Sequence, residues 1–536
     1  MTETDKKIMM TKLATAAREG KVSRRSFINH SIAAGMTASA ATGLWGTNAK
    51  AAPQRGGTFR LAQHDGNTSD THDPGTYVTF GMINLAHTYR SYLTQINPDQ
   101  TLGADVATEW SATPDAKEWT FKLNSAATFH SGPKVTANDV LASMNHHRGE
   151  TSTSAAKALL ADVEEIVDNG DSSVTFKLAS PNADLPWLMT DYHLAIIPAN
   201  ADGTANWQSA DGCGPYKLVE NQFGVSSRLV RHEEWHGDGA YFDEIQILYI
   251  NDPNARQTAV LTGDVDAASQ LENKTLPLLS RSKDVEIDNV PSAAAVTMPM
   301  HSNVAPFDNA DVRNAIKLSI NREDIIEKIQ FGAATIGNDF HHSPAMPYWP
   351  DSIPQRAYDP DQAKALLKKA GMDNLTISLS TADAVASGAV DAAVLYAEHA
   401  KASGITINVV REPNDGYYSD VWLKKPFCMV QWGARPTPDV MYSLAYKDDA
   451  AWNESFWQNS RFNELLRIGK AELDDAKRQE VYTEMAMIAH TDGATLIPYF
   501  PNFVYARRKN LRHNGQLAAS WPMDGARAAQ RWWFET

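Results

Sequence analysis

Two kinds of hydrophobic pattern run along the chain. Apolar and polar residues alternate with a period of two at 119–123 and 174–178, which predicts strands with one buried face. The apolar run within 241–250 predicts a further strand. Thr136 precedes an apolar-periodic segment and has Asp139 three residues later, a pairing typical of a helix start. The first half of the chain is therefore expected to be rich in strands.

The second half has a different texture. A period near 3.6 predicts one long amphipathic helix over 310–331 and another over 461–489, and a shorter helix is expected over 360–371. Strand-like stretches separate the helices, at 375–379, 405–410, 428–432 and 496–505. Alternating helices and strands indicate an α/β domain.

The N-terminal residues read as an export signal. Arg24 and Arg25 stand directly before a mildly apolar stretch over 28–45, which is too polar for a membrane anchor. A small-x-small site ends at Ala51, so cleavage is expected near that residue. This leader resembles a twin-arginine signal peptide. The alternative is a basic amphipathic helix on a cytosolic protein.

Charge and cysteine usage narrow the class of protein. Without residues 1–51, 41 basic and 61 acidic residues remain, which argues against a nucleic-acid partner because phosphates require a basic face. A chain of this length is expected to fold as two or three domains. Cys213 and Cys428 are the two cysteines, and buried thiols are favoured over a disulfide between them.

Five motifs in order carry a family resemblance. They are Leu102–Trp110 leading into 118–132, the helix start at Thr136–Val140, the stretch Gly212–Leu218, the segment Pro306–Ile316, and Ile320–Glu323. In this order they resemble the extracytoplasmic solute-binding proteins of family 5, which serve ABC importers of peptides, nickel chelates and some oligosaccharides. The resemblance covers nearly all of 54–536.

The resemblance implies a fold and a division of the chain. The expected fold is α/β and bilobed, a type II periplasmic-binding-protein clamshell of the large peptide-binding class, with an extra subdomain in lobe I. Residues 1–51 would be the signal peptide, 52–265 the first part of lobe I, 266–495 lobe II, and 496–536 a return segment of lobe I. Two chain crossings would form the hinge on which the lobes close around ligand.

The resemblance also implies the function. We expect a periplasmic receptor that captures a peptide or peptide-like solute and delivers it to ABC permease and ATPase subunits at the inner membrane. It is expected to be a monomer that needs no cofactor or resident metal and performs no catalysis. A sensor or chaperone receptor without import remains an alternative, and the ligand itself is open.

One motif points to a different class. His232, Glu233 and His236 form H-E-x-x-H, which in a secreted zinc metallohydrolase places both histidines on one helix face. Here a strand-like stretch precedes the motif, and Gly237 and Gly239 follow it. We therefore expect a turn, with acid and histidine side chains at the surface, and no zinc site.

The principal candidate for ligand binding is the segment 431–439. It leaves an apolar strand at its C-terminal end, where open α/β sheets bind ligands. Arg435 stands near the place of an aspartate that grips the peptide amino terminus in dipeptide receptors of the family, and an arginine suits a carboxylate or phosphate instead. The alternative is a structural ion pair between Arg435 and Asp439 or another acid. Trp432 and Gly433 belong to the same candidate site.

Further candidates are placed by the resemblance and by residue type. Trp452 is expected to line the cleft, whereas Trp457 is expected in the core. His342 lies in a loop that often faces ligand in the family, and adjacent histidines such as His341 and His342 point apart and make a poor chelating pair. From lobe I the candidates in or beside the first strand-end loop are His64, Asp65 and Tyr77, with loop solvation as the alternative.

Overall fold

The computed structural model describes residues 53–535, so the expected leader and its arginine pair lie outside the described residues. Residues 57–532 form one compact unit, whose fold is described below. The described part of the other unit contains the short strand β21 (Trp533–Phe534), with a bridge between Gln54 and Phe534.

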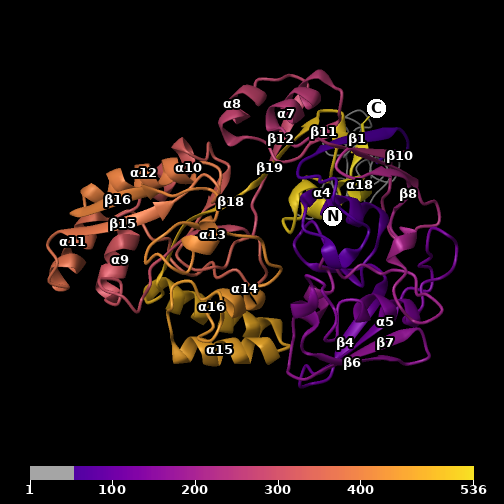
Figure 1. Ribbon diagram of the computed structural model, residues 1–536, viewed down its shortest axis with the longest axis horizontal. Helices are drawn as coiled ribbons and strands as arrows, with labels where there is room; N and C mark the ends of the chain where they lie inside the picture. Colours follow the sequence, from indigo (N-terminus) through magenta and orange to yellow (C-terminus); the bar gives the residue numbers. More distant parts are fainter. Residues whose placement is uncertain (1–52, 536) are drawn as a thin grey trace, which may run out of the picture. The chain divides into compact units, whose positions relative to one another are not determined.

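A seven-stranded mixed sheet organises what we call the first lobe, residues 57–290 and 503–532 (Figure 1). Its order is β12-β19-β11-β1-β10-β9-β8, and β1 runs parallel to both neighbours, β10 and β11. The bounds are β1 (Thr58–Gln63), β8 (Tyr216–Gln222), β9 (Ser226–Arg231), β10 (Glu244–Tyr249), β11 (Ala267–Ala268), β12 (Val285–Val290) and β19 (Phe503–Arg508). A strand from near the C-terminus therefore completes a sheet begun near the N-terminus.

The first lobe also carries a smaller antiparallel sheet of order β4-β5-β7-β6. Its strands are β4 (Ala107–Ala112), β5 (Glu118–Leu123), β6 (Val163–Asp168) and β7 (Ser173–Leu178). The predicted strands at 119–123 and 174–178 are thus confirmed. Helix α5 (Ala137–Asn145) starts where expected, because the N–H of Thr136 donates to Asp139 Oδ2 at 2.8 Å. This sheet is the expected extra subdomain.

The remaining first-lobe elements are short. They are the strand pair β2 (Thr94–Ile96) and β3 (Leu102–Ala104), the strand β20 (Leu511–Arg512), and helices α4 (Phe80–Tyr89), α6 (Leu185–Leu188), α7 (Pro253–Thr262), α8 (Leu276–Leu279), α17 (Pro522–Ala526) and α18 (Ala528–Arg531). Within α17, four successive residues from Met523 to Ala526 have φ between 61° and 65°, so this turn is left-handed.

The second lobe, residues 293–501, has its own sheet and core. The sheet order is β14-β18-β13-β17, and β15 and β16 form a separate parallel pair. The bounds are β13 (Ala295–Pro299), β14 (Ala334–Ile336), β15 (Leu375–Thr381), β16 (Ile405–Arg411), β17 (Val430–Trp432) and β18 (Thr495–Pro501). One hydrophobic cluster is built wholly from residues of this lobe, from Ala293 to Phe500. The alternation of helix and strand confirms the α/β expectation.

Two predicted long helices are each divided, so these predictions were wrong. The segment 310–331 contains α9 (Ala310–Leu318) and α10 (Arg322–Lys328), and 461–489 falls in α15 (Ser460–Ala471) and α16 (Asp475–Thr491). In each case a capping side chain starts a new helix. Asn321 accepts from the N–H of Asp324 at 3.0 Å, and Asp474 accepts from that of Lys477 at 3.0 Å. The other helices here are α11 (Pro360–Lys369), α12 (Ala389–Lys401), α13 (Tyr417–Asp420) and α14 (Pro438–Ala445).

The crossings between the lobes fall later in the chain than expected. Strands β11 and β12 still belong to the first-lobe sheet, and β18 belongs to the second-lobe sheet. The chain therefore crosses after β12 and returns between β18 and β19, rather than near 265 and 496. Sequence texture missed this because β11 and β12 alternate with helices, as the second lobe does.

Two further properties concern the described residues as a whole. Cys213 and Cys428 are buried free thiols, as predicted. Among the described helices, none combines the length and apolar character that a membrane crossing requires.

Candidate functional site

Residues 433–437 form a loop that is held at both ends by regular structure of the second lobe. The loop follows Trp432, which pairs with Ala295 in the β13–β17 ladder. It ends at Thr437, which caps α14 by accepting a hydrogen bond from the N–H of Val440 at 3.4 Å. Proline at the first position of α14 loses no helical hydrogen bond there. The loop thus presents Arg435 from a fixed base.

Arg435 has no acid to neutralise it in the described part of the chain. Its Nη1 donates to the carbonyl oxygens of Gly433 at 3.2 Å and Ala434 at 2.9 Å, and no described carboxylate lies within 4.0 Å of the guanidinium. Burial lowers the pKa of Arg435, and the charge of Asp191 in the first lobe opposes that effect. A poorly solvated guanidinium without an ion pair is a favourable partner for an anionic group.

The first lobe faces this region with a row of aromatic side chains. Tyr192 meets Trp521 edge to face at 5.1 Å, Trp521 meets Phe80 at 6.0 Å, and Phe80 packs on the His64 ring at 4.8 Å. The His64 ring is fixed by a 2.9 Å hydrogen bond between Nδ1 and Ser269 Oγ. Burial lowers the pKa of His64 to about 3, so this side chain is neutral at physiological pH.

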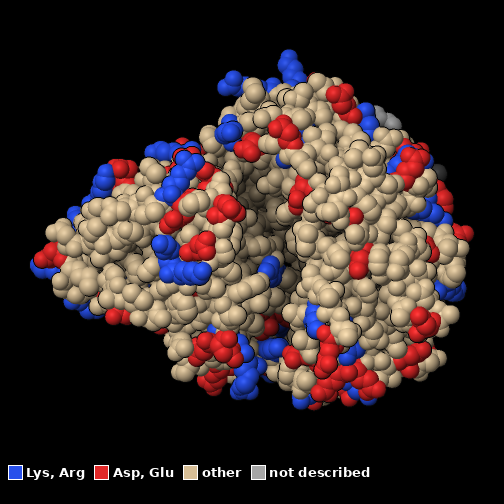
Figure 2. Space-filling model, in the orientation of Figure 1, with Lys and Arg blue, Asp and Glu red and all other residues tan. Residues whose placement is uncertain are grey.

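A hollow lies between the two lobes. Figure 2 shows the surface recessed between the region of α13 and α14 and the region of α4, and mostly uncharged residues line its visible walls. A cavity of about 780 Å³ is lined by residues of both lobes, among them Trp187 of the first and Tyr348 of the second. The Arg435 loop leads into α14 and Phe80 begins α4, and these two helices lie on either side of this hollow in Figure 1. The cavity of about 780 Å³ is lined by other residues.

Three tryptophans pack together beside the loop. Trp432 lies 6.0 Å from Trp452 and 6.2 Å from Trp422, measured between ring centroids. Trp432 is 5 % exposed and Trp452 43 % exposed, so Trp452 offers the larger open face. Behind them, the buried Glu454 accepts hydrogen bonds at 2.8 Å from Trp422 Nε1 and from Thr297 Oγ1. Burial raises the pKa of Glu454 to about 7.

The lobes also touch directly through a buried ion pair. Asp184, between β7 and α6 of the first lobe, pairs with Arg478 on α16 of the second, and Thr437 Oγ1 donates to the same carboxylate. Asp439 lies beside this group, and burial together with the charge of Asp184 raises its pKa to about 7. Asp439 therefore belongs to the contact between the lobes and does not pair with Arg435.

Three predicted site residues are held by their own neighbours, and two of them are buried. His342 is fully buried and its Nε2 lies 2.8 Å from the carbonyl oxygen of Pro347. Tyr77 is 1 % exposed, and its hydroxyl accepts a hydrogen bond from Arg90 Nη1 at 2.8 Å. Asp65 is exposed, and its carboxylate accepts from the N–H of Phe80 at 2.9 Å at the start of α4. These three side chains have structural roles and do not join the site proposed below.

The H-E-x-x-H segment is a turn after β9, as predicted. The expectation that its histidines lie at the surface was wrong, because each ring is held by an interior partner: His232 is 3 % exposed and the His236 side chain 2 % exposed. His232 Nδ1 lies 3.3 Å from the carbonyl oxygen of Gly214, whereas His236 Nε2 lies 3.1 Å from Asp105 Oδ1. Glu233 is exposed and pairs with Arg231. The two histidines thus serve different partners. In the described chain, no group of three His, Cys, Asp or Glu side chains is arranged to hold a metal ion.

Sequence reasoning missed several residues around Arg435. Asp191 and Tyr192 come from a segment more than 200 residues before Arg435, and Trp521, which packs on Tyr192, comes from the return segment after it. No local pattern connects these residues. Glu454 was missed because a single carboxylate between tryptophans carries no periodic signal. The one signal in the sequence for these residues was an isolated aromatic residue in the return segment, Trp521, because exposed aromatic residues often line binding sites.

Two sheets joined by two crossings, with a lined hollow between them, define a two-lobed binding protein. The comparison with protein families agrees. The model of the bacterial extracellular solute-binding proteins, family 5, matches residues 101–454. The chain belongs to this family.

Known relatives extend over most of the chain. The probable D,D-dipeptide-binding periplasmic protein DdpA of Escherichia coli is 25% identical over 472 residues, covering 83% of this chain and 90% of that protein. Di/tripeptide-binding protein 2 of Pseudomonas aeruginosa is 25% identical over 485 residues, covering 82% and 89%. The structure of the periplasmic binding protein DppA from Helicobacter pylori, in complex with peptide STSA, shares the fold at a TM-score of 0.69 and 20% identity, over 90% of this chain and 99% of that one.

Proposed function

We propose that this protein is a periplasmic receptor of an ABC importer, and that it captures a peptide or peptide-like solute bearing a carboxylate. The protein acts as a monomer that delivers solute to the membrane permease and its ATPase. Relatives named for dipeptides and tripeptides support the solute class. The work is differential binding to open and closed lobes, with no reaction on the solute.

The observation that carries the proposal is the uncompensated charge of Arg435. Its guanidinium faces Asp191 and Tyr192 across the lobes and lacks an ion-pair partner in the described residues. A ligand carboxylate can accept two parallel hydrogen bonds from the Arg435 guanidinium. A ligand ammonium group has no acceptor atom and carries the same charge as Arg435, so it cannot bind there in this way. The open face of Trp452 and the row from Tyr192 to His64 supply apolar area for the rest of the solute.

The metallohydrolase alternative receives no support from the geometry. A zinc protease needs both histidines on one helical face, and here they lie in a turn with separate partners. Because His236 also holds Asp105, the informative variant is His232→Ala, which should leave solute binding unchanged.

Mass spectrometry of small molecules released from the denatured protein tests the proposal. We expect a solute with a free carboxylate and one or more amide bonds. Small-angle scattering of ligand-free protein, with and without that solute, should show a smaller radius of gyration on binding. An unchanged scattering curve at saturation would contradict closure of the lobes.

Export by the twin-arginine route is part of the proposal and rests on Arg24 and Arg25. Replacing both arginines with lysine should leave the precursor in the cytoplasm, as cell fractionation measures. The mature protein should begin within a few residues of Ala52. Normal export of the double variant would contradict this route while leaving the receptor function intact.

A further inference from the structure

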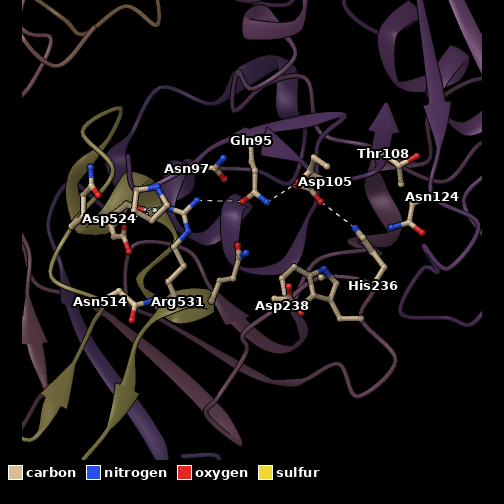
Figure 3. A pocket seen from close by; sticks show the side chains of 16 residues that line it. Gln95, Asn97, Asp105, Thr108, Asn124, His236, Asp238, Asn514, Asp524 and Arg531 are labelled. Carbon is tan, nitrogen blue, oxygen red and sulfur yellow. Dashed lines mark hydrogen bonds and ion pairs between the residues drawn. The ribbon is translucent and has the colours of Figure 1, made fainter. Parts of the chain in front are cut away.

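A second cavity lies wholly within the first lobe, apart from the hollow between the lobes. Its volume is about 410 Å³, which falls in the range of roughly 300–1,000 Å³ typical of small-molecule sites. The walls come from β2, from the turn after β9, and from the return segment around α17 and α18 (Figure 3). We call it the first-lobe pocket. No described residue of the second lobe lines it, so its walls do not depend on lobe closure.

The buried charges around the pocket are compensated within the protein. Arg531 Nη1 lies 3.1 Å from Asp524 Oδ1, on one side of the space in Figure 3. On the other side, Asp105 pairs with His236 at 3.1 Å and with Arg527 at 3.2 Å. Burial alone would raise the pKa of Asp105, but the hydrogen bond from His236 and the charge of Arg527 outweigh it and lower the pKa. These ion pairs leave no unbalanced buried charge for an ionic ligand.

Two adjacent side chains keep an unsatisfied hydrogen-bonding atom at the pocket. Trp235 Nε1 and His236 Nδ1 are buried and have no partner in the described residues. The His236 side chain is 2 % exposed. His236 Nε2 faces the Asp105 carboxylate, which leaves Nδ1 on the other side of the ring, and the indole nitrogen of Trp235 is a donor. The two rings are neighbours, with centroids 5.7 Å apart. Because a hydroxyl group both donates and accepts, a ligand with several hydroxyl groups can supply a partner for each of these two atoms.

Much of the remaining lining matches the same chemistry, and the exposed carboxylate of Asp238 also lines the pocket. Six carboxamide side chains contribute to the wall, each with both donor and acceptor atoms: Gln95, Asn97, Asn124, Asn514, Gln516 and Gln530. The indole of Trp235 adds a flat apolar surface.

The backbone at one wall is strained. Asp524, which lines the pocket, belongs to the left-handed run from Met523 to Ala526, a conformation that L-residues other than glycine seldom adopt in series. Its carboxylate is held by the N–H of Ala518 at 2.8 Å and by Trp532 Nε1 at 3.2 Å. Strain of this kind concentrates at binding sites, where the surrounding structure enforces it.

We propose that the first-lobe pocket binds a small neutral polyhydroxy compound, a sugar or polyol, through Trp235 Nε1 and His236 Nδ1. This site is separate from the one that holds the transported solute. Occupancy of one does not require occupancy of the other.

Saturation-transfer NMR on the full mature protein tests the site, with D-glucose, trehalose and myo-inositol as probes and glucuronate as a charged counterpart of glucose. At least one neutral probe should bind, and glucuronate should bind more weakly than glucose. Trp235→Phe removes the indole donor and keeps a ring, so affinity should fall roughly three- to tenfold. Trp110→Phe, on β4 of the same lobe and away from the pocket lining, is the matched control and should bind the probe normally.

A second variant guards against an ambiguous result. A Cβ at Gly237 would stand 2.5 Å from the Trp235 ring, so Gly237→Ala should displace the indole and abolish probe binding. Binding of the transported solute should persist in both variants, which separates this proposal from the receptor function. Absence of binding by all three neutral probes, unchanged affinity in Trp235→Phe, or tighter binding of glucuronate would each overturn the proposal.

Discussion

Two arginines of the second lobe reach toward the first lobe, and they meet different surroundings. Arg478 is 3 % exposed and pairs with Asp184, with Asp439 close by. Arg435 is partly buried, contacts only backbone carbonyl oxygens in the described structure, and has no ion pair. The first arrangement satisfies its charge when the lobes meet, whereas the second leaves its charge for a ligand. The contrast distinguishes an interaction between the lobes that the protein makes by itself, at Arg478, from one that needs the solute, at Arg435.

The largest expected effect comes from breaking the buried pair. Arg478→Met leaves the Asp184 carboxylate buried without its partner, which typically costs about 3–5 kcal/mol. Because the pair joins the lobes, its loss should weaken their contact, and we expect lower solute affinity by calorimetry. Arg461→Met is the control, since Arg461 pairs with Glu484 at the surface, where solvent screens the pair, and it should leave solute affinity nearly unchanged. Equal effects from the two variants would contradict a buried contact between the lobes.

The second prediction concerns pH and Asp439. Its folded-state pKa of about 7 lies above the unfolded value of 3.8, so its contribution to stability is fully present below pH 3.8 and is lost as pH rises through 7. Asp439→Asn should therefore gain stability relative to wild type between pH 4 and pH 8, by at most about 4 kcal/mol. Melting temperatures of the two proteins across this range provide the measurement.

Comparison with wild type is essential in that experiment. Buried neutral histidines such as His341, whose pKa burial lowers to about 3, change stability in the opposite direction as pH rises. Glu454→Gln should behave like Asp439→Asn, because burial raises the pKa of Glu454 to about 7 as well. A difference from wild type that does not vary with pH would show that Asp439 is ionised in the folded protein.

The smallest expected effect concerns the open aromatic face. Trp452→Ala removes an indole face on which a ring of the solute can pack. The lost ring–ring interaction should weaken solute binding by about 0.5–1.5 kcal/mol, in addition to the energy lost with the buried apolar area. Trp457→Ala is unsuitable as a control because Trp457 is core, as predicted, at 3 % exposure. Trp187→Ala, in the wall of the cavity between the lobes, is the better comparison. Equal losses would place the solute along that cavity instead of beside Arg435.

The sequence predicted the class of fold because each strand or helix buries one face, and this burial leaves a periodic hydrophobic pattern in the sequence. The order of the family motifs supplied the rest of the prediction. The sequence left open, as the alternative to a ligand site, an ion pair between Arg435 and Asp439, which are four residues apart and do not pair in the structure. Residues four apart are neighbours on the surface of a helix, but here Arg435 precedes the cap Thr437 while Asp439 lies in the first turn of α14. Asp439 instead faces Asp184, Lys470 and Arg478.

The first-lobe residues that surround the candidate site could not be predicted for a different reason. Asp191 and Tyr192 follow a short helix of the first lobe, and Trp521 belongs to the return segment. Contacts among such distant segments depend on how the lobes meet. The strained turn at Met523–Ala526 was likewise invisible, because local preference alone would exclude it.

One measurement tests the central claim most directly: a double-mutant cycle in which calorimetry compares the extracted solute and its carboxamide analogue on wild type, Arg435→Gln and Arg435→Lys. If Arg435 holds the solute carboxylate, Arg435→Gln should cost about 2–5 kcal/mol with the acid and little with the amide, so the two changes couple strongly. Arg435→Lys should recover only part, since one ammonium cannot reproduce the two-pronged guanidinium contact. Additive effects, or near-wild-type affinity of Arg435→Gln for the acid, would contradict the account.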